Sequence, residues 1–364
     1  LTLFTKVATQ YPAGTYVISN NSLAGTSAVG LRSGVVLRGE RSFNTTILIA
    51  TNGVAWQAAG IAVFGAAPTA PWIDIASGYD LHSTTVSITN VTSFVPGDWV
   101  QIREGTNAAW KIDNGSDVCG LGQIVQVTSV AVTGAPAGTV TLATPLTLQY
   151  QAGLPLTPGV LISPQICRLN QVITNAGVEN LRIARVTTTG AANTRDQVPS
   201  VGFRYAVNCW VRGCDMTNVF GSGVFGYYAG NIEITGNYIH HAYEFDGGGS
   251  GYGINLFYRT SQCLTENNIF KTLRHSMVVQ YGASDNVFGY NYSEDSAGYL
   301  SDMTAHGNYC HANLFEGNCG VFMSLDNSHG ANGPGNCYFR NRARGVLTQA
   351  ITIPDTLGTN QAFV

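Results

Sequence analysis

The chain has 364 residues, of which 45% are hydrophobic and 11% are charged, and its formal net charge is −3. No apolar run approaches the roughly 20 residues that a membrane-spanning helix needs, so no membrane span is expected. Binding to nucleic acid is not expected either, because it requires a basic surface that neutralises phosphates. Glycine is frequent, and Thr, Val, Ile and Asn outnumber helix-favouring residues, so the composition predicts an all-β chain.

Residues 1–97 contain short apolar segments punctuated by glycine and turn residues. GTYVIS begins at Gly14, GVVLRGE at Gly34 and TTILI at Thr45. These segments resemble the first coils of right-handed parallel β-helices of the pectate-lyase-like superfamily. The resemblance implies that residues 1–97 form N-terminal β-helix coils.

The middle of the chain interrupts this pattern. GDWVQIRE, from Gly97, and GTVTLATPLTLQY, from Gly138, do not follow the coil period. Their alternation of apolar and polar residues favours β-hairpins. We therefore expect an inserted β-hairpin subdomain over residues 98–165.

The strongest signal is an internal repeat within residues 166–364. Six similar segments start at steps of 22 to 31 residues, and a small residue follows each start five positions later. The starts are Asn208, Asn231, Gln262, Asn286, Asn308 and Asn336. Asn and Gly tolerate the left-handed backbone of tight turns, and stacked Asn side chains can hydrogen-bond between coils. The repeat predicts regular Asn-laddered β-helix coils; a β-sandwich with irregular loops is the alternative.

Two of the longer steps contain extra residues, at 240–253 and 326–335. Insertions in repeat proteins tend to gather on one face, which is often the binding face. The eight cysteines form no CxxC pair, which makes a zinc site a weak interpretation. They are either disulfide-bonded, if the protein is exported, or free and buried inside the coils.

The stretch from Ser284 to Gly345 resembles a poorly characterised group of exported bacterial β-helix proteins. The superfamily contains polysaccharide lyases, glycoside hydrolases and non-catalytic adhesins. The resemblance therefore implies a secreted, extracellular location and a polysaccharide partner, but it does not define the chemistry.

Histidines indicate where that chemistry could lie. Six of the seven follow residue 239. His306 ends one strand of the repeat, and Asp326 and His329 follow the equivalent strand of the next coil, so we expect the three to cluster. Histidine acts as a base or an acid near neutral pH. A hydrogen-bonded turn network, or a metal site completed by another carboxylate, is an alternative for the same residues.

Elimination from a uronate needs a cation for the carboxylate and a base for the C5 proton. Lysine is scarce, so arginine is the expected basic residue. Arg259 ends one repeat strand, and Arg274 and His275 precede the next, which lies about 4.8 Å away along the sheet. Their LRH triplet resembles the LRHG of alginate- and dermatan-cleaving β-helix lyases, although here it precedes a strand. As turn residues, Arg274 and His275 could also make purely structural hydrogen bonds.

Hydrolysis would instead need paired carboxylates. Glu244, Asp246 and Asp302 are the candidates that we expect to contact substrate. Tyr258 and Tyr281 lie in the same coils, where aromatic rings could stack on sugars or fill the core.

The sequence thus predicts a secreted polysaccharide-active β-helix, a polysaccharide lyase or glycoside hydrolase, with Ca²⁺ as a possible cofactor of a uronate lyase. The alternative is a non-catalytic structural or adhesive solenoid, which could self-associate through its ends.

Overall fold

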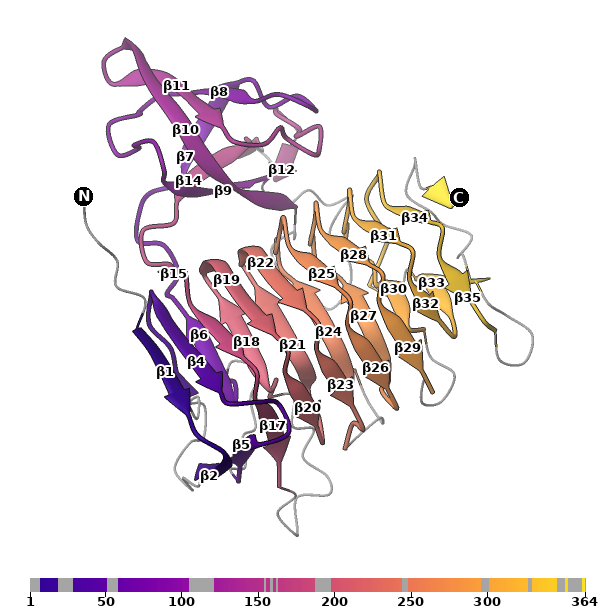
Figure 1. Cartoon of the computed structure of the whole chain (residues 1–364). Coiled ribbons are helices and arrows are strands. Elements are labelled where there is room, and N and C mark those ends of the chain that lie inside the picture. Colours follow the sequence, from indigo (N-terminus) through magenta and orange to yellow (C-terminus); the bar gives the residue numbers. More distant parts are fainter. Residues whose placement is uncertain are drawn as a thin grey trace.

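The computed structural model describes residues 7–18, 29–50, 58–104, 121–153, 155–157, 160–161, 163–186, 198–243, 248–295, 301–326, 329–345, 351–352 and 362–363. These residues form strands and turns. None of their segments is a helix long and apolar enough to cross a membrane. Three long parallel sheets make a solenoid, and a small barrel is attached to it (Figure 1).

Each coil of the solenoid gives one strand to each sheet. Sheet A contains β1 (Val7–Tyr11), β4 (Val35–Gly39), β15 (Ile173–Thr174), β16 (Gly177–Glu179), β19 (Ala206–Arg212), β22 (Gly230–Thr235), β25 (Leu264–Glu266), β28 (Val287–Gly289), β31 (Leu314–Glu316), β34 (Cys337–Phe339) and β37 (Ala362–Phe363). Sheet B contains β2 (Gly14–Ile18), β5 (Thr45–Ile49), β17 (Arg182–Arg185), β20 (Asp215–Thr217), β23 (Tyr238–His240), β26 (Ile269–Lys271), β29 (Tyr292–Glu294), β32 (Cys319–Gly320) and β35 (Arg342–Ala343). Sheet C contains β3 (Val29–Gly30), β6 (Ile61–Phe64), β18 (Val201–Arg204), β21 (Ser222–Tyr227), β24 (Tyr252–Phe257), β27 (His275–Val279), β30 (Met303–Ala305), β33 (Met323–Leu325) and β36 (Ile351–Thr352). The parallel β-helix expected from the repeat is confirmed.

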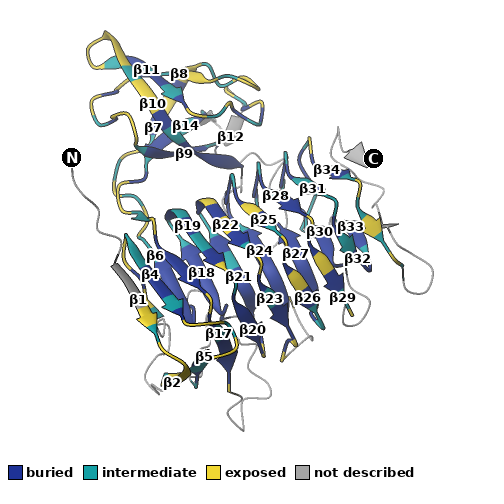
Figure 2. Ribbon diagram, in the orientation of Figure 1, coloured by how far each residue is buried: buried dark blue, intermediate teal, exposed yellow. Residues whose placement is uncertain are grey.

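The core lies between the three sheets, because alternate residues of each strand point inward. Buried residues follow the strands along the whole solenoid (Figure 2). Parallel register places identical positions above one another, so Phe288, Phe315 and Tyr338 stack with ring centroids 4.8 and 4.6 Å apart. The core is therefore a set of columns that run along the solenoid axis.

Two asparagine ladders line the corners of the solenoid. At the turn from sheet A to sheet B, each Asn side chain donates to the next one at 2.9–3.0 Å, through Asn237, Asn268, Asn291, Asn318 and Asn341. A second ladder, through Asn286, Asn313 and Asn336, occupies the turn from C to A at 2.9 Å. The ladders satisfy polar groups that the turns bury.

The ladders correct part of the repeat alignment. Asn267 is an exposed turn residue, and its neighbour Asn268 is the ladder member. The repeat start that corresponds to Asn286 and Asn336 is Asn313, not Asn308, because Val287 pairs with Leu314 and Leu314 with Cys337. The segment NYCHANLFEGN contains three asparagines, so the spacing of the repeat alone does not identify the one that matches Asn286.

The inserted subdomain is a closed barrel with the strand order β10-β11-β8-β7-β14-β9. Its strands are β7 (Ile73–Ser77), β8 (Thr85–Ile88), β9 (Trp99–Arg103), β10 (Gly122–Gly134), β11 (Ala137–Leu142) and β14 (Gln165–Arg168), and β12 (Pro155–Thr157) pairs with β13 (Val160–Leu161) beside it. Ile73 pairs with Ile166, so strands from both sides of the hairpins close the barrel. The first two barrel strands, β7 and β8, lie before residue 98, where the sequence predicted coils of the solenoid. Their sequences resemble those of coil strands.

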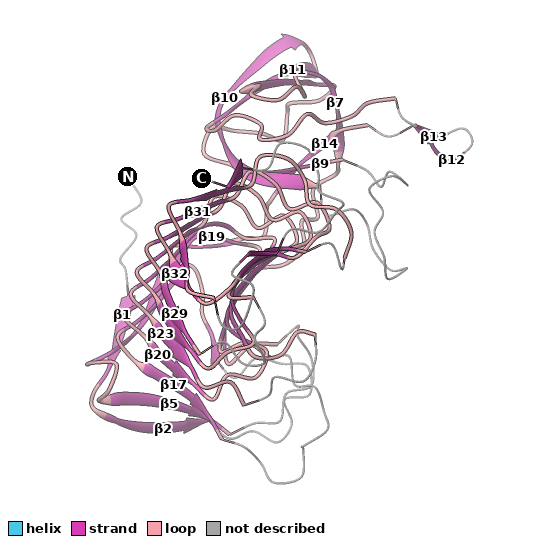
Figure 3. Ribbon diagram, turned by 90° about the vertical axis from the view of Figure 1, so that its right-hand side faces the viewer, coloured by secondary structure: helices cyan, strands magenta, loops and turns pink. Residues whose placement is uncertain are grey.

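The barrel interrupts one turn between sheets C and A and sits over that edge of the solenoid (Figure 3). Its two ends meet, since the Ala66 amide donates to the Gln171 carbonyl at 2.9 Å.

The seven cysteines in the described ranges are free, and five of them are buried. These seven cysteines are thus free thiols and not disulfide partners, and Cys319 and Cys337 are only partly buried. Cys119 lies outside the described residues.

Candidate functional site

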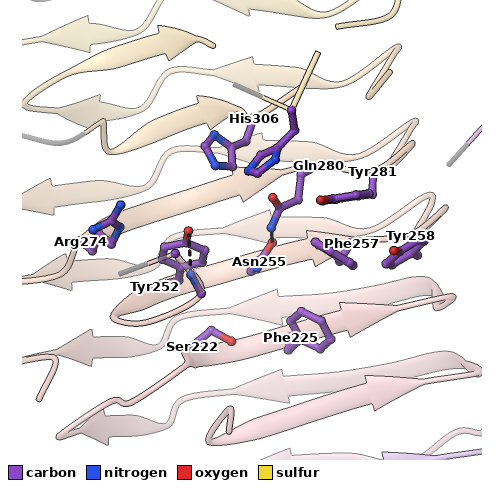
Figure 4. Close-up of a pocket in the computed structure, with 13 residues that line it drawn as sticks. Ser222, Phe225, Tyr252, Asn255, Phe257, Tyr258, Arg274, Gln280, Tyr281 and His306 are labelled. Carbon is purple, nitrogen blue, oxygen red and sulfur yellow. Dashed lines mark hydrogen bonds between the residues drawn. The ribbon is translucent and has the colours of Figure 1, made fainter. Parts of the chain in front are cut away.

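A cavity of about 540 Å³ opens on the outer face of sheet C (Figure 4). Its lining combines aromatic rings, two side-chain amides, a guanidinium group and two imidazoles. The lining residues are Ser222, Phe225, Gly248, Gly249, Tyr252, Asn255, Phe257, Tyr258, Arg274, Gln280, Tyr281, His306 and His329.

Strand register builds one end of this cavity. Val279 pairs with Ala305, and Ala305 with Leu325, so the residues that follow them also lie side by side. These following residues are Gln280, His306 and Asp326. The Gln280 amide donates to the Asn255 side chain at 3.0 Å, which fixes both amides against the cavity.

His306 and Asp326 form a dyad. The His306 Nδ1 is hydrogen-bonded to the Asp326 Oδ2. A carboxylate only accepts, so Nδ1 carries the proton and Nε2 keeps its lone pair. The side chains are 14% and 30% exposed, which leaves the dyad accessible from the cavity. His329 lies edge-on to His306, with ring centroids 4.6 Å apart. The three side chains that were expected to cluster therefore lie together.

His275 lies behind this dyad. Its Nδ1 is 2.7 Å from the Ser301 carbonyl and donates to it, and its ring lies 5.8 Å from that of His306. Burial lowers the pKa of His275 to about 4. The His275 imidazole is thus neutral at physiological pH, and it lies on the protein side of the dyad.

A row of tyrosines leads to the dyad. Tyr205, Tyr228, Tyr258 and Tyr281 each follow a strand of sheet C, in four successive coils, with φ between 37° and 53°. This left-handed turn directs each ring to the same side, and neighbouring centroids lie 5.0–5.6 Å apart. Tyr281 lies 5.7 Å from the His329 ring. The tyrosine row and the dyad are therefore continuous.

Arg259 does not join the cluster, which corrects its expected catalytic role. It is 3% exposed, and its Nε donates to the Leu121 carbonyl of the barrel at 3.0 Å. Its φ of 56° turns the side chain toward the barrel instead of the cavity. Arg259 therefore fastens the barrel to the solenoid.

Asp302 is also not available to a substrate. It is fully buried at the turn between sheets B and C, where it accepts hydrogen bonds from Ser293 at 2.6 Å and from the Phe322 amide at 3.0 Å. Its role is to hold that corner.

Arg274 does line the cavity, on the side opposite Tyr281 (Figure 4). Glu244 and Asp246 lie outside the described residues.

Sequence reasoning missed several lining residues. Ser222, Phe225, Tyr252, Asn255 and Gln280 lie in or next to strands of sheet C. Their signal is the alternation within each strand, but choosing the outward positions requires the register. Among the described residues, no group of three or more His, Cys, Asp or Glu side chains could hold a metal ion.

The family described as "Right handed beta helix region" matches residues 172–344. Among solved structures, the tailspike gp49 of Pseudomonas phage LKA1 is 13% identical, with a TM-score of 0.49, over 97% of this chain and 69% of the tailspike.

The tailspike gp54 of Acinetobacter baumannii bacteriophage AP22, solved with capsular saccharide, is 12% identical, with a TM-score of 0.47, over 98% of this chain and 64% of the tailspike. The catalytic domain of a GH87 alpha-1,3-glucanase is 9% identical, with a TM-score of 0.30, over 79% and 86% of the two chains. The chain thus spans about two thirds of the length of the two tailspikes. No curated protein sequence gives a significant match. The three parallel sheets thus have the fold of a right-handed parallel β-helix, and the family model matches the part of it from residue 172 to residue 344.

Proposed function

We propose that this chain is a secreted, polysaccharide-active β-helix protein that binds a glycan on the outer face of sheet C and cleaves it at His306. The observation that carries the proposal is the His306–Asp326 dyad at the end of the tyrosine row. Aromatic rings stack on the apolar faces of sugars, and the Asn255 and Gln280 amides can bond hydroxyl groups.

The dyad supports a lyase reaction. In elimination, the His306 Nε2 takes the C5 proton of a uronate, the C–H electrons form the C4–C5 double bond, and the C4–O bond breaks. The leaving oxygen takes a proton, for which His329 is the nearest imidazole. The uronate carboxylate needs a positive charge, which Arg274 in the cavity lining would supply. Asp326 stabilises the imidazolium that forms on His306.

The test is incubation with a panel of uronates and neutral glycans, with Ca²⁺ or with a chelator. We expect uronate products that absorb in the near ultraviolet, and we expect the His306→Ala variant to make none. New reducing ends without that absorbance would assign the chain to the hydrolases. Loss of cleavage in the chelator would assign the positive charge to Ca²⁺, and loss in Arg274→Gln alone would assign it to Arg274.

A non-catalytic glycan-binding solenoid is the competing function, and the tyrosine row is the observation that favours it. Tyr258 and Tyr281, the two members of the row that line the cavity, can hold a chain without any reaction. Binding without cleavage across the panel, by a protein that light scattering shows to self-associate, would support this function and reject the lyase.

A further inference from the structure

We propose that the cavity between the barrel and the solenoid is a second subsite, which holds neutral sugar units of the same glycan. This inference rests on the function proposed above. The cavity has a volume of about 620 Å³. Leu81, Leu148 and Gln151 line it from the barrel, and Tyr309 and Pro334 line it from turns between sheets C and A.

The walls of this cavity are fixed by contacts between the barrel and the solenoid. The Gln262 side chain donates to the Thr144 hydroxyl at 2.6 Å. The Ile124 amide donates to the Ser261 hydroxyl at 3.2 Å, in a buried contact. Pre-formed walls lower the entropy that binding costs, which is a feature of ligand sites.

Residues that are close in the sequence line the two cavities. His306 lines the first, and Tyr309, three residues later, lines the second. Three residues span at most about 11 Å, so the two Cα atoms lie within the length of a short oligosaccharide. The Tyr309 amide donates to the Ala331 carbonyl at 2.9 Å, which joins the turn after His306 to the turn after His329. A glycan that reacts at His306 can therefore extend beneath the barrel.

The chemistry of the second cavity selects uncharged sugars. None of the residues given for its lining is Asp, Glu, Lys or Arg, whereas the first cavity contains Arg274 beside the dyad. Tyr309 offers a ring for stacking, Leu81 is 45% exposed at the cavity wall, and Gln151 and Thr147 offer hydrogen bonds. A uronate would lose hydration there and would find no guanidinium or ammonium group, because the one basic side chain of the lining is the His82 imidazole.

The experiment measures binding affinity against chain length, by calorimetry on the full chain. The probes are oligogalacturonates, alginate oligosaccharides and cello-oligosaccharides, from disaccharide to octasaccharide, and mixed oligomers with neutral units at either end. We expect affinity to rise again once a neutral extension passes the first cavity. Tyr309→Ala should remove about tenfold from the affinity for the extended oligomers and leave the affinity for the short ones unchanged.

Tyr309 also packs against the barrel core, so Leu81→Ser provides a second variant at an exposed position. Val132→Ser, at another exposed hydrophobic residue of the barrel, is its control. Leu81→Ser should weaken only the extended oligomers, and Val132→Ser should weaken none. Binding of short oligomers with no gain from extension would overturn the second subsite alone. Failure to bind any oligomer would overturn the proposed function itself.

Discussion

At the scale of single residues, three neighbouring histidines receive different properties from their surroundings. His306 is held by a carboxylate, His275 is kept neutral by burial, and His329 lies edge-on to His306. The side chain is the same in each case, so the partner decides its role. Only His306 combines a carboxylate partner with a place in the cavity lining, which makes it the base of the proposed reaction.

The first prediction concerns Asp326. Asp326→Asn keeps the size of the side chain but cannot stabilise a positive charge on His306, so kcat should fall by a factor of about 10² to 10⁴. The measurement is the rate of cleavage of the best polymer of the panel, with circular dichroism to verify folding. Asp295→Asn is the matched control, because Asp295 is an exposed turn residue at the edge of sheet B. Equal rates in the two variants would remove Asp326 from the mechanism.

Part of this site could be predicted from the sequence alone. His306, Asp326 and His329 follow equivalent strands of adjacent coils, and in a parallel stack equivalent positions meet. Arg259 and Asp302 satisfied the same rule, yet their side chains point to the barrel and to a buried corner. A left-handed φ at Arg259 and the inward side of a turn at Asp302 are conformations that residue spacing does not encode.

At the scale of the element, the asparagine ladders hold the coil corners. Each ladder side chain donates to the next Asn and to a backbone carbonyl, and its oxygen accepts from the preceding coil. Asn291 thus contacts Asn268, Thr265 and Asn318 at once. Chains of buried hydrogen bonds strengthen one another, and a gap leaves polar groups without partners.

The second prediction follows from that gap. Asn291→Ala should lower the free energy of unfolding by about 3 kcal/mol, because the Asn268 amide and the Thr265 carbonyl lose buried partners. Urea unfolding measures it as a lower midpoint with an unchanged slope. Asn267→Gly is the control, since Asn267 is exposed and glycine accepts its φ of 54°. A loss as large in the control would show that the ladder is not the source of the stability.

The presence of these ladders was predictable, but their register was not. The left-handed residue of each turn is the one before the ladder member, such as Gly236 or Tyr290. Asn recurs at the ladder position because its side chain both donates and accepts hydrogen bonds between coils. Where two or three asparagines fall within a few residues, as in Asn308 and Asn313, composition cannot decide which one faces inward. That choice is made by the strand pairing of Leu314 with Val287.

At the scale of the whole molecule, buried histidines make stability depend on pH. Burial lowers the pKa of His275 and of His311 to about 4, from the usual 6.5. Below pH 6.5 the unfolded chain binds protons that the folded chain does not bind until about pH 4. These two histidines therefore lower the unfolding free energy as the pH falls from 6.5 to 4, by roughly 3 kcal/mol each. Burial raises the pKa of Glu104 to about 7 and that of Asp285 to about 6, so these two carboxyl groups act in the opposite direction.

The third prediction is measured by urea unfolding at a series of pH values across that range. The His311→Gln variant should lose roughly 3 kcal/mol less stability than the unsubstituted protein between pH 6.5 and pH 4, whatever its stability at neutral pH. His82→Gln should keep the full slope, because His82 is exposed in the barrel. A slope that is the same in all three proteins would mean that carboxyl groups cause the acid sensitivity.

The solenoid could be predicted from its repeat, whereas the closed barrel could not. Its first strands, IDIAS and TVSI, have the length and alternation of coil strands. Only their antiparallel pairing with β14 and β11 separates them from the solenoid. Such long-range pairing depends on the tertiary packing of the barrel core and not on local sequence.

The meeting of the barrel's two ends has a consequence for the order of folding. Strand β16 must pair with β4, but about a hundred residues separate the chain positions that the barrel joins, and closing so long a loop costs entropy. A barrel that folds first brings Ala66 and Gln171 together and so removes that cost. We expect amide protection in pulsed hydrogen exchange to arise in the barrel before it arises in β4 and β16. The inserted barrel would then hold the two chain segments together while the first coils assemble.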